Sequence, residues 1–370
     1  MLQTAMPLLA VDLHASYVLL GTIGWVAQAI RVPFCISAGH ISEVTGRARI
    51  IVPAALIAAV MIAAHSLAAS PKMVMVLYAI ALASIGTFYP PLQALIGDVS
   101  TKGELRKNLG MFNVGWCVGG AITAAAAGLL VKHGLNSVFY TGAACCVVAA
   151  ILVLTWRAET VAHDPEEEDG VQSDGNHEPL LLICRFGHFV GFFGYSVTRI
   201  LFVKLGRSTF HWDKSTVALV CAGLLCGLGV GILLSNTSPW WRGKLWPQLL
   251  AQAVMFLSAL GVSLVSSPVL SSLRMPIVIA CLFFAFGIAQ SVTYTGALYY
   301  GLSSRKKKGA NTGIHEAIVA GAAASGCLFG GIAAQKTSAY APFVLLAAIA
   351  LVALVLTCLV WARRPVLAQA

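Results

Sequence analysis

The chain has 370 residues, of which 58% are hydrophobic and only 10% are charged. A soluble domain carries roughly 25% charged residues, so this chain has too few to cover a surface that faces water, and most of it is predicted to lie in lipid. The formal charge of +10 comes from basic residues in short gaps between apolar runs. That pattern is typical of membrane orientation and excludes a phosphate-binding surface, so no nucleic-acid partner is expected.

With about 20 apolar residues for each membrane crossing, the sequence predicts eleven complete transmembrane helices. They lie near residues 16–38, 49–67, 72–96, 108–132, 135–157, 179–204, 214–236, 245–265, 273–301, 310–335 and 339–362. The segment ahead of them, "MLQTAMPLLAV", would reach about 17 Å as a helix and cannot cross a core of roughly 30 Å. We therefore expect an all-α membrane protein with an N-terminal partial helix.

Lysine and arginine gather in the segments that this topology places on the side of residues 39–49, and the run 305–308 is the largest group. The positive-inside rule predicts that this side is cytoplasmic. The segment 158–178 is acidic and poor in apolar residues, as expected of a linker. We expect three parts: an N-terminal helical bundle at 1–157, an acidic cytoplasmic linker at 158–178 and a C-terminal bundle at 179–370.

The two predicted bundles contain related sequences. Residues 107–130 align with residues 310–333 without a gap, so that Asn108 matches Asn311, Gly110 matches Gly313 and Gly128 matches Gly331. A repeat with the same membrane orientation requires an even number of helices in each half. Two pseudo-symmetric bundles of six helices are therefore expected, with the first helix incomplete.

This organisation resembles the major facilitator superfamily of secondary transporters. The stretch "GHISEVTGRAR" also resembles the family signature Gly-x-x-x-Asp-Arg-x-Gly-Arg-Arg, although Val44 and Ala48 depart from it. In that family, such a charge cluster latches the two halves together. The resemblance implies a gating role for the matching positions and for one acidic residue at the end of the fourth helix; these are Gly39, Glu43, Gly46, Arg47 and Asp98. The alternative is that they are ordinary loop charges.

The resemblance also implies a substrate cavity lined by the family's first, fourth, seventh and tenth helices. At 100° per residue, one face of the predicted helix 179–204 carries basic and aromatic side chains. This face holds Arg185, His188, Phe192, Tyr195, Ser196 and Arg199. Such a wall suits an anionic or amphipathic solute. In the alternative interpretation, Arg185 and Arg199 extend to opposite membrane interfaces.

Three further predicted helices carry polar residues. Tyr89 and Gln93 lie beside a Pro-Pro pair in the fourth family helix, and Gln290 and Tyr294 share one face of the tenth. These four are candidate solute contacts, or they hold helices together. Glu316 in the eleventh helix, next to His315, is a candidate proton site. It could instead pair with the basic run 305–308 or with Arg47, and Arg31 is expected to serve packing or the loop network.

The sequence contains no nucleophile elbow, phosphate-binding loop, HExxH or CxxC motif, so no enzyme, cofactor or metal site is expected. We predict a secondary transporter that moves a small organic solute by alternating access in a bacterial inner membrane. The partners are the solute, the lipid bilayer and a coupling proton or ion that the sequence leaves open. The alternative is a non-transporting member of the same lineage with an assembly or sensing role, suggested by the incomplete first helix.

Overall fold

A computed structural model describes residues 1–98, 105–155, 177–238, 240–302 and 308–363. Within these ranges every regular element is a helix. The elements are α1 (Leu2–Asp12), α2 (Tyr17–Thr45), α3 (Arg47–Ala64), η1 (His65–Leu67), α4 (Pro71–Asp98), α5 (Leu105–Leu130), η2 (Val131–His133), α6 (Leu135–Thr155), α7 (His177–Ser196), η3 (Val197–Leu201), α8 (Phe202–Ser208), α9 (Lys214–Thr237), α10 (Trp246–Ser266), η4 (Ser271–Leu273), α11 (Pro276–Leu302), α12 (Lys308–Lys336) and α13 (Ala341–Ala362).

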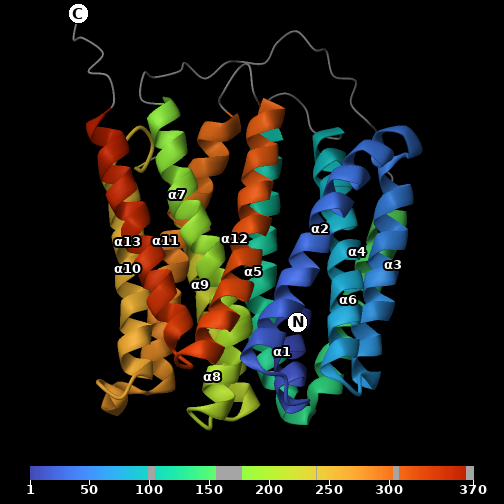
Figure 1. Cartoon of the computed structure of the whole chain (residues 1–370). Helices are drawn as coiled ribbons and strands as arrows, with labels where there is room; N and C mark the ends of the chain where they lie inside the picture. Colours follow the sequence, from blue (N-terminus) through green and yellow to red (C-terminus); the bar gives the residue numbers. More distant parts are fainter. Residues whose placement is uncertain (99–104, 156–176, 239, 303–307, 364–370) are drawn as a thin grey trace, which may run out of the picture.

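Eleven helices in the described part of the chain are long and apolar enough to cross a membrane. The elements α7, η3 and α8 form one of them, a continuous span from Glu178 to Ser208. The prediction of eleven complete spans preceded by a short helix is thus confirmed. The helices stand side by side in Figure 1, and the chain is an integral membrane protein with many crossings.

The helices form two bundles. Figure 1 places α2, α3, α4 and α6 on the right and α7 and α9–α13 on the left. The main contacts between the bundles join α2 to α12 and α5 to α9. The repeated segments 107–130 and 310–333 lie in α5 and α12, so each copy of the repeat packs against the opposite bundle. The helix α5 packs on α9 and its equivalent α12 packs on α2, so the two contacts correspond to each other. This correspondence is the pseudo-symmetry that the repeat predicts.

We name the two ends of the molecule by their turns. At the linker end, α2 turns into α3 at Gly46; at the far end lie residues 13–16 and 209–213. The sequence predicts a loop at 39–49, but α2 continues to Thr45, and Gly46 alone separates it from α3. Gly46 has φ +95°, a conformation that other residues rarely adopt, and no proline follows Pro33 before it. The predicted linker 158–178 lies almost wholly outside the described residues, and its boundaries stay a prediction.

The bundles meet most closely at the far end. A Cβ atom on Gly21 of α2 would lie 2.3 Å from the carbonyl oxygen of Cys327, and one on Gly331 of α12 would lie 2.7 Å from that of Tyr17. Towards the linker end, no atom lies within 4 Å of a Cβ placed on Gly110, which shares the face of α5 that packs on α9 through Cys117. The two bundles therefore converge at the far end and separate towards the linker end.

The short helix α1 runs from the middle of the molecule to the far end (Figure 1). It packs against α6, α8 and η3, so it contacts both bundles. Most of its side chains are buried, including Leu2, Thr4 and Met6. The partial helix is therefore an integral part of the contact between the bundles.

Candidate functional site

A five-residue π-helical turn, η3, interrupts the span formed by α7 and α8. Such turns are rare in proteins, and those that do occur often lie at functional sites. The extra residue in the turn moves side chains away from the positions that a regular α-helix would give them. Arg199 lies at the centre of this turn and is only 4% exposed. The sequence contains no proline or glycine inside η3 that would have predicted the irregularity.

Arg199 is buried at the contact between the bundles. Its Nη2 atom donates a hydrogen bond of 3.2 Å to Oγ1 of Thr4 on α1, while Nε and Nη1 have no hydrogen-bond partner among the described residues. The guanidinium carbon lies 5.9 Å from the ring centroid of Tyr195, whose hydroxyl donates to Oε1 of Gln3 at 2.7 Å. The alternative interpretation places Arg199 at a membrane interface. In the structure, the side chain of Arg199 is instead buried between the bundles.

A cluster of rings, which we call the His188 cluster, lies on the same face of α7. It consists of His188, Phe192 and Tyr195 on α7, Tyr294 on α11 and His315 on α12. The imidazole rings of His188 and His315 are stacked with their centroids 4.3 Å apart, and the ring of Tyr294 lies 5.6 Å from His188. Phe192 contacts both His188 and Tyr195, at 4.9 Å and 5.9 Å between centroids.

The structure thus brings together four of the predicted site residues and adds His315. Tyr195 and Tyr294 also pack against the apolar cluster formed by α5 and α9, so the His188 cluster borders the opposite bundle. Arg185 is half-buried on α7 and lies within electrostatic reach of His315. Ser196 instead faces α12, where a Cβ on Gly326 would meet its Oγ at 2.2 Å.

The remaining candidates are distributed differently. Tyr89 on α4 is half-buried and lies within reach of Arg31 and Trp116, whereas the side chain of Gln93 is exposed. Gln290 is fully buried, and a Cβ on Gly191 would meet its Cγ at 2.6 Å. Gln290 is therefore packed between α11 and α7, although its amide atoms have no hydrogen-bond partner in the described part of the chain.

At the linker end, Arg47 Nη1 donates to the Oγ of buried Ser42 at 2.8 Å, and Ser42 donates to the carbonyl oxygen of Gly39 at 2.8 Å. Glu43 is exposed and makes no ion pair with any described residue. Asp98 ends α4, but its side chain is not among the parts described. No atom lies within 4 Å of a Cβ on Gly39. The gating role of this group stays a prediction.

Glu316 follows His315 on α12 and has an exposed side chain. The charge of Arg31 on α2 lies within electrostatic reach of it, so the two oppose each other across the bundles. Glu316 and Arg31 do not form a direct ion pair with each other in the described part of the chain. The expected partners in the run 305–307 lie outside the described residues.

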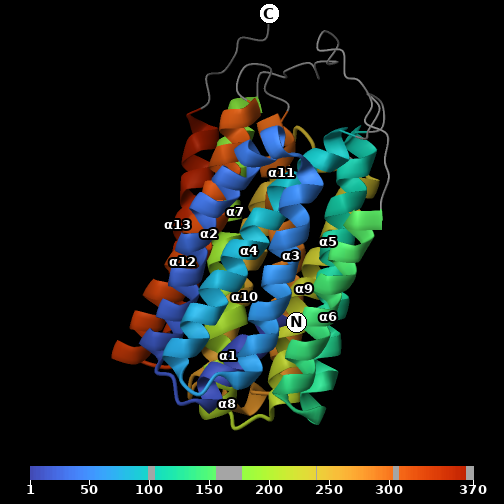
Figure 2. The same cartoon turned by 90° about the vertical axis from the view of Figure 1, so that its right-hand side faces the viewer.

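A separate cavity of about 530 Å³ lies among α2, α3 and α4. Figure 2 shows α4 between α2 and α3 on this flank of the molecule. The cavity is lined mostly by apolar side chains, and its polar contributors are Ser37, Arg49, Ser84 and Thr87. None of the predicted solute-binding residues lines it.

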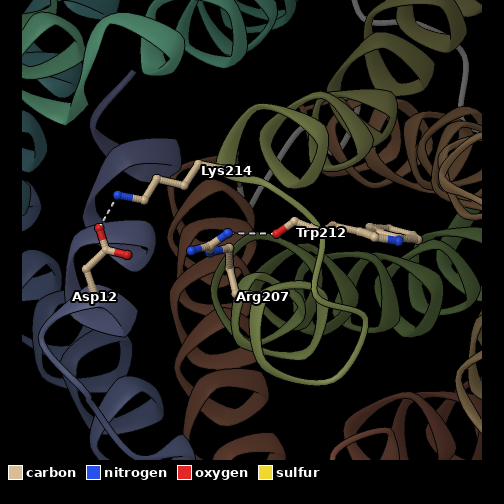
Figure 3. A network of polar contacts seen from close by, with 4 residues as sticks. All are labelled: Asp12, Arg207, Trp212 and Lys214. Atoms are coloured by element: carbon tan, nitrogen blue, oxygen red, sulfur yellow. Dashed lines mark hydrogen bonds and ion pairs between the residues drawn. The ribbon is translucent and has the colours of Figure 1, made fainter.

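Polar contacts join the bundles at the far end. Figure 3 shows an ion pair between Asp12, at the end of α1, and Lys214, at the start of α9. Beside it, Nη1 of Arg207 donates to the carbonyl oxygen of Trp212 at 2.8 Å. Lys204 also donates to the carbonyl oxygen of Ala15. The contacts of Asp12 with Lys214 and of Lys204 with Ala15 cross between the bundles and hold the far end closed, whereas the Arg207–Trp212 hydrogen bond lies within the C-terminal bundle.

Three polar residues of α1, namely Gln3, Thr4 and Asp12, lie at the site or at the far-end contacts but are not among the predicted site residues. The sequence predicts that this segment is too short to cross the membrane, and that prediction assigns no role to its polar side chains. A signal was present: the superfamily's cavity uses its first helix, and α1 occupies that place in the chain. Polar residues at positions 3 and 4 of an otherwise apolar segment were therefore candidates.

The family model described as the Major Facilitator Superfamily matches residues 1–303, most of the chain. The chain belongs to this superfamily. No curated protein matches it by sequence.

Solved structures of superfamily transporters share the fold. A bacterial homolog of the human lysosomal transporter Spinster, inward-facing and occupied, has a TM-score of 0.70 at 16% identity, over 98% of this chain and 92% of that one. Its inward-facing, unoccupied form has a TM-score of 0.68 at 16% identity, with the same coverage. The nucleoside transporter NupG has a TM-score of 0.73 at 13% identity, over 97% of this chain and 95% of that one.

Membership of the Major Facilitator Superfamily gives the site its context. Transporters of this kind hold the solute between two bundles that rock about it. Arg199 and the His188 cluster lie where the two bundles of this chain meet, so they occupy the place that such a mechanism requires.

Proposed function

We propose that this secondary transporter moves a small organic solute with an anionic group, which Arg199 binds between the bundles. The observation that carries the proposal is the isolated guanidinium. Arg199 is buried, has one hydrogen bond to Thr4, and has no carboxylate partner among the described residues. A buried, unpaired charge in a membrane protein is costly, so a solute carboxylate or phosphate would satisfy donors that the protein leaves open.

The His188 cluster supplies the second part of the site. Its aromatic rings offer an apolar surface one to three helical turns from Arg199 along α7. A solute with an anionic end and an apolar body would use both features. Tyr89 and Arg185 are further candidate contacts of the solute. Gln93, which is exposed, and Gln290, which is packed between α11 and α7, are weaker candidates for solute contact.

The conformation supports transport by alternating access. The bundles are closed at the far end and apart at the linker end, and the sequence predicts that the linker end is cytoplasmic. We propose that the structure is the inward-facing state in a bacterial inner membrane. In the opposite state, the group formed by Gly39, Glu43, Gly46, Arg47 and Asp98 would latch the linker end.

The proposal is tested with detergent-purified protein and a library of carboxylates, phosphate esters and their neutral analogues. A bound solute raises the temperature of unfolding, so a thermal screen identifies the ligands within the library. We expect anionic solutes to bind and Arg199→Gln to raise their Kd about 10- to 100-fold, since a hydrogen bond to a charged group contributes about 1.5–3 kcal/mol.

Arg274→Gln is the matched control. Arg274 is an arginine of the same bundle whose Nε and Nη2 atoms donate to the carbonyl oxygens of Val265, Ser266 and Ser267. This variant should unfold at a lower temperature and keep its solute affinity. Equal binding of neutral analogues, or unchanged affinity in Arg199→Gln, would contradict the proposal. Uptake of the solutes into proteoliposomes separates a transporter from the alternative, a non-transporting member of the superfamily.

A further inference from the structure

The stacked rings of His188 and His315 are unusual because they are buried without polar partners. His188 is 0% exposed and His315 is 5% exposed. Both ring nitrogens of His188 and the Nδ1 of His315 lack a hydrogen-bond partner in the described part of the protein. A neutral imidazole has one donor and one acceptor, and each one buried without a partner costs about 1–3 kcal/mol.

Packing alone does not require this arrangement. His65 in the opposite bundle is also fully buried and stacked, with its ring centroid 5.2 Å from that of Phe139. Its Nδ1 atom, however, lies 2.7 Å from the carbonyl oxygen of Met61, so one ring nitrogen is satisfied. Both ring nitrogens of His188 and the Nδ1 of His315 lack such an anchor among the described residues, which leaves these three nitrogens available to a ligand.

Charged and titratable groups face the pair from several of the elements around it. They are Arg185 on α7, Tyr294 on α11, Glu316 on α12 and, beyond Tyr294, Cys117 on α5. The helices α10 and α13, which also pack against α7, contribute the uncharged Gln252 and Thr357. A proton on the pair would meet repulsion from Arg185, while the Glu316 carboxylate lies within electrostatic reach of Tyr294, whose ring contacts both imidazoles.

Glu316 connects the pair to the opposite bundle. It also faces Arg31 on α2, so its carboxylate can compensate either a protonated imidazole on its own bundle or the guanidinium across the gap. A closure of the linker end would bring Arg31 closer to Glu316, so that the guanidinium would compete for the carboxylate. The stability of a proton on the pair would then depend on the relative position of the bundles.

We propose that His188 and His315 form a proton-binding site that takes up one proton from water at the open linker end. The proton adds to one ring nitrogen and leaves by the same route or after the bundles have moved. A second proton is excluded, because two imidazolium rings whose centroids are 4.3 Å apart would repel each other. The inference rests on the proposed function only for its coupling to a solute; proton binding itself is independent of it.

The test is nuclear magnetic resonance of the full-length protein in detergent, with ¹⁵N-labelled histidine, between about pH 4 and pH 8, which brackets ordinary imidazole titration. His188→Phe and His315→Phe assign the two signals. If a phenylalanine variant fails to fold, His188→Gln and His315→Gln replace it. His65→Phe is the matched control, a buried stacked histidine outside the site.

We expect the signals of His188 and His315 to change together with the uptake of one proton. Replacing either residue should alter the titration of the other, whereas His65→Phe should leave both unchanged. Two rings that stay neutral at every pH at which the protein is folded would overturn the inference, as would independent titration of each ring. Neither result depends on solute transport, so a failure here is distinguishable from a failure of the proposed function.

Coupling is then tested in proteoliposomes with an anionic solute found in the binding screen. We expect a pH gradient to drive accumulation in the wild-type protein. In folded His315→Phe we expect the rate of solute uptake to be the same with and without the gradient, whatever the affinity of the variant for the solute. Uptake by His315→Phe that still increases with the pH gradient would overturn this inference.

Discussion

Single side chains in this protein differ in whether their polar atoms find partners. Arg274 and Lys204 at the far end donate to backbone carbonyl oxygens, whereas Arg199 and His188 lie buried with nitrogens that no described residue pairs. Groups of the first kind contribute to the stability of the fold. Those of the second kind are costly unless a ligand satisfies them, which is why we place the solute and the proton there.

Asp213 belongs to the first kind and gives a prediction on pH. It caps the start of α9: its carboxylate accepts from the backbone N–H of Thr216 at 2.8 Å and from the Thr216 hydroxyl at 2.7 Å. These hydrogen bonds hold the pKa of the Asp213 carboxyl below its usual value. Because the folded pKa is lowered, the stabilisation is fully present above the usual carboxyl pKa of about 3.9 and is lost as the pH falls through the lowered value.

We therefore expect Asp213→Ala to reduce stability by about 1 kcal/mol at neutral pH and by progressively less below about pH 4. Thermal unfolding of both proteins in detergent over this pH range provides the measurement. Asp213→Asn retains one acceptor oxygen and should unfold between the two. A difference that persists unchanged down to about pH 3 would show that the carboxylate does not contribute in this way.

The sequence indicated the chemistry of the site residues better than their partners. The helical period placed His188, Phe192 and Tyr195 on one face, because a regular helix fixes which side chains share a side. It could not show that Tyr195 bonds to Gln3 or that His188 stacks on His315. Those contacts join residues distant in sequence, and the packing of α7 against α1 and α12 decides them.

At the scale of single elements, glycine has opposite uses in different membrane-spanning helices. Gly21 and Gly331 let the backbones of α2 and α12 touch at the far end. Gly115 and Gly119 in α5 have open space beside them. We infer that the first pair fixes the closed far end. Gly115 and Gly119 lie opposite the face of α5 that packs on α9 through Cys117 and Ala124, so they take no part in the contact between the bundles.

Substitution by alanine separates these uses. A Cβ on Gly21 would lie 2.3 Å from a backbone carbonyl oxygen of Cys327, so Gly21→Ala should lower stability by about 1–3 kcal/mol through overpacking. Gly115→Ala should be neutral or stabilise α5 by up to about 1 kcal/mol, because alanine favours helix more than glycine. Unfolding followed by tryptophan fluorescence in detergent measures both. Equal effects of the two variants would contradict the packing argument.

At the scale of the whole molecule, the contacts at the far end determine which side is closed. The ion pair of Asp12 with Lys214 joins the first helix of one bundle to a helix of the other (Figure 3). Both side chains are partly exposed, so the pair contributes about 1 kcal/mol or less. That amount is still enough to change a two-state population up to about five-fold.

We expect Lys214→Ala to shift the population towards the state that is open at the far end. Non-cysteine spin labels at Lys72 and Lys336, which are exposed on opposite bundles at this end, report the distance by double electron–electron resonance. The fraction of long distances should rise in Lys214→Ala and stay constant in His133→Ala, a substitution of another exposed residue at the same end. An unchanged distribution in Lys214→Ala would show that the ion pair does not influence the equilibrium.

The amino-acid sequence alone determined the class of this protein: an all-α membrane protein with eleven complete spans, one partial helix and two related bundles. Hydropathy and a repeat are local properties of the chain, and lipid imposes helices on any apolar span. Only the tertiary structure decided the conformation of 39–49, the π-helical turn at Arg199, the stacked histidines and the closed far end. Each of these depends on which helices pack together, and that packing follows from the shape of whole helix faces, which no short pattern in the sequence contains.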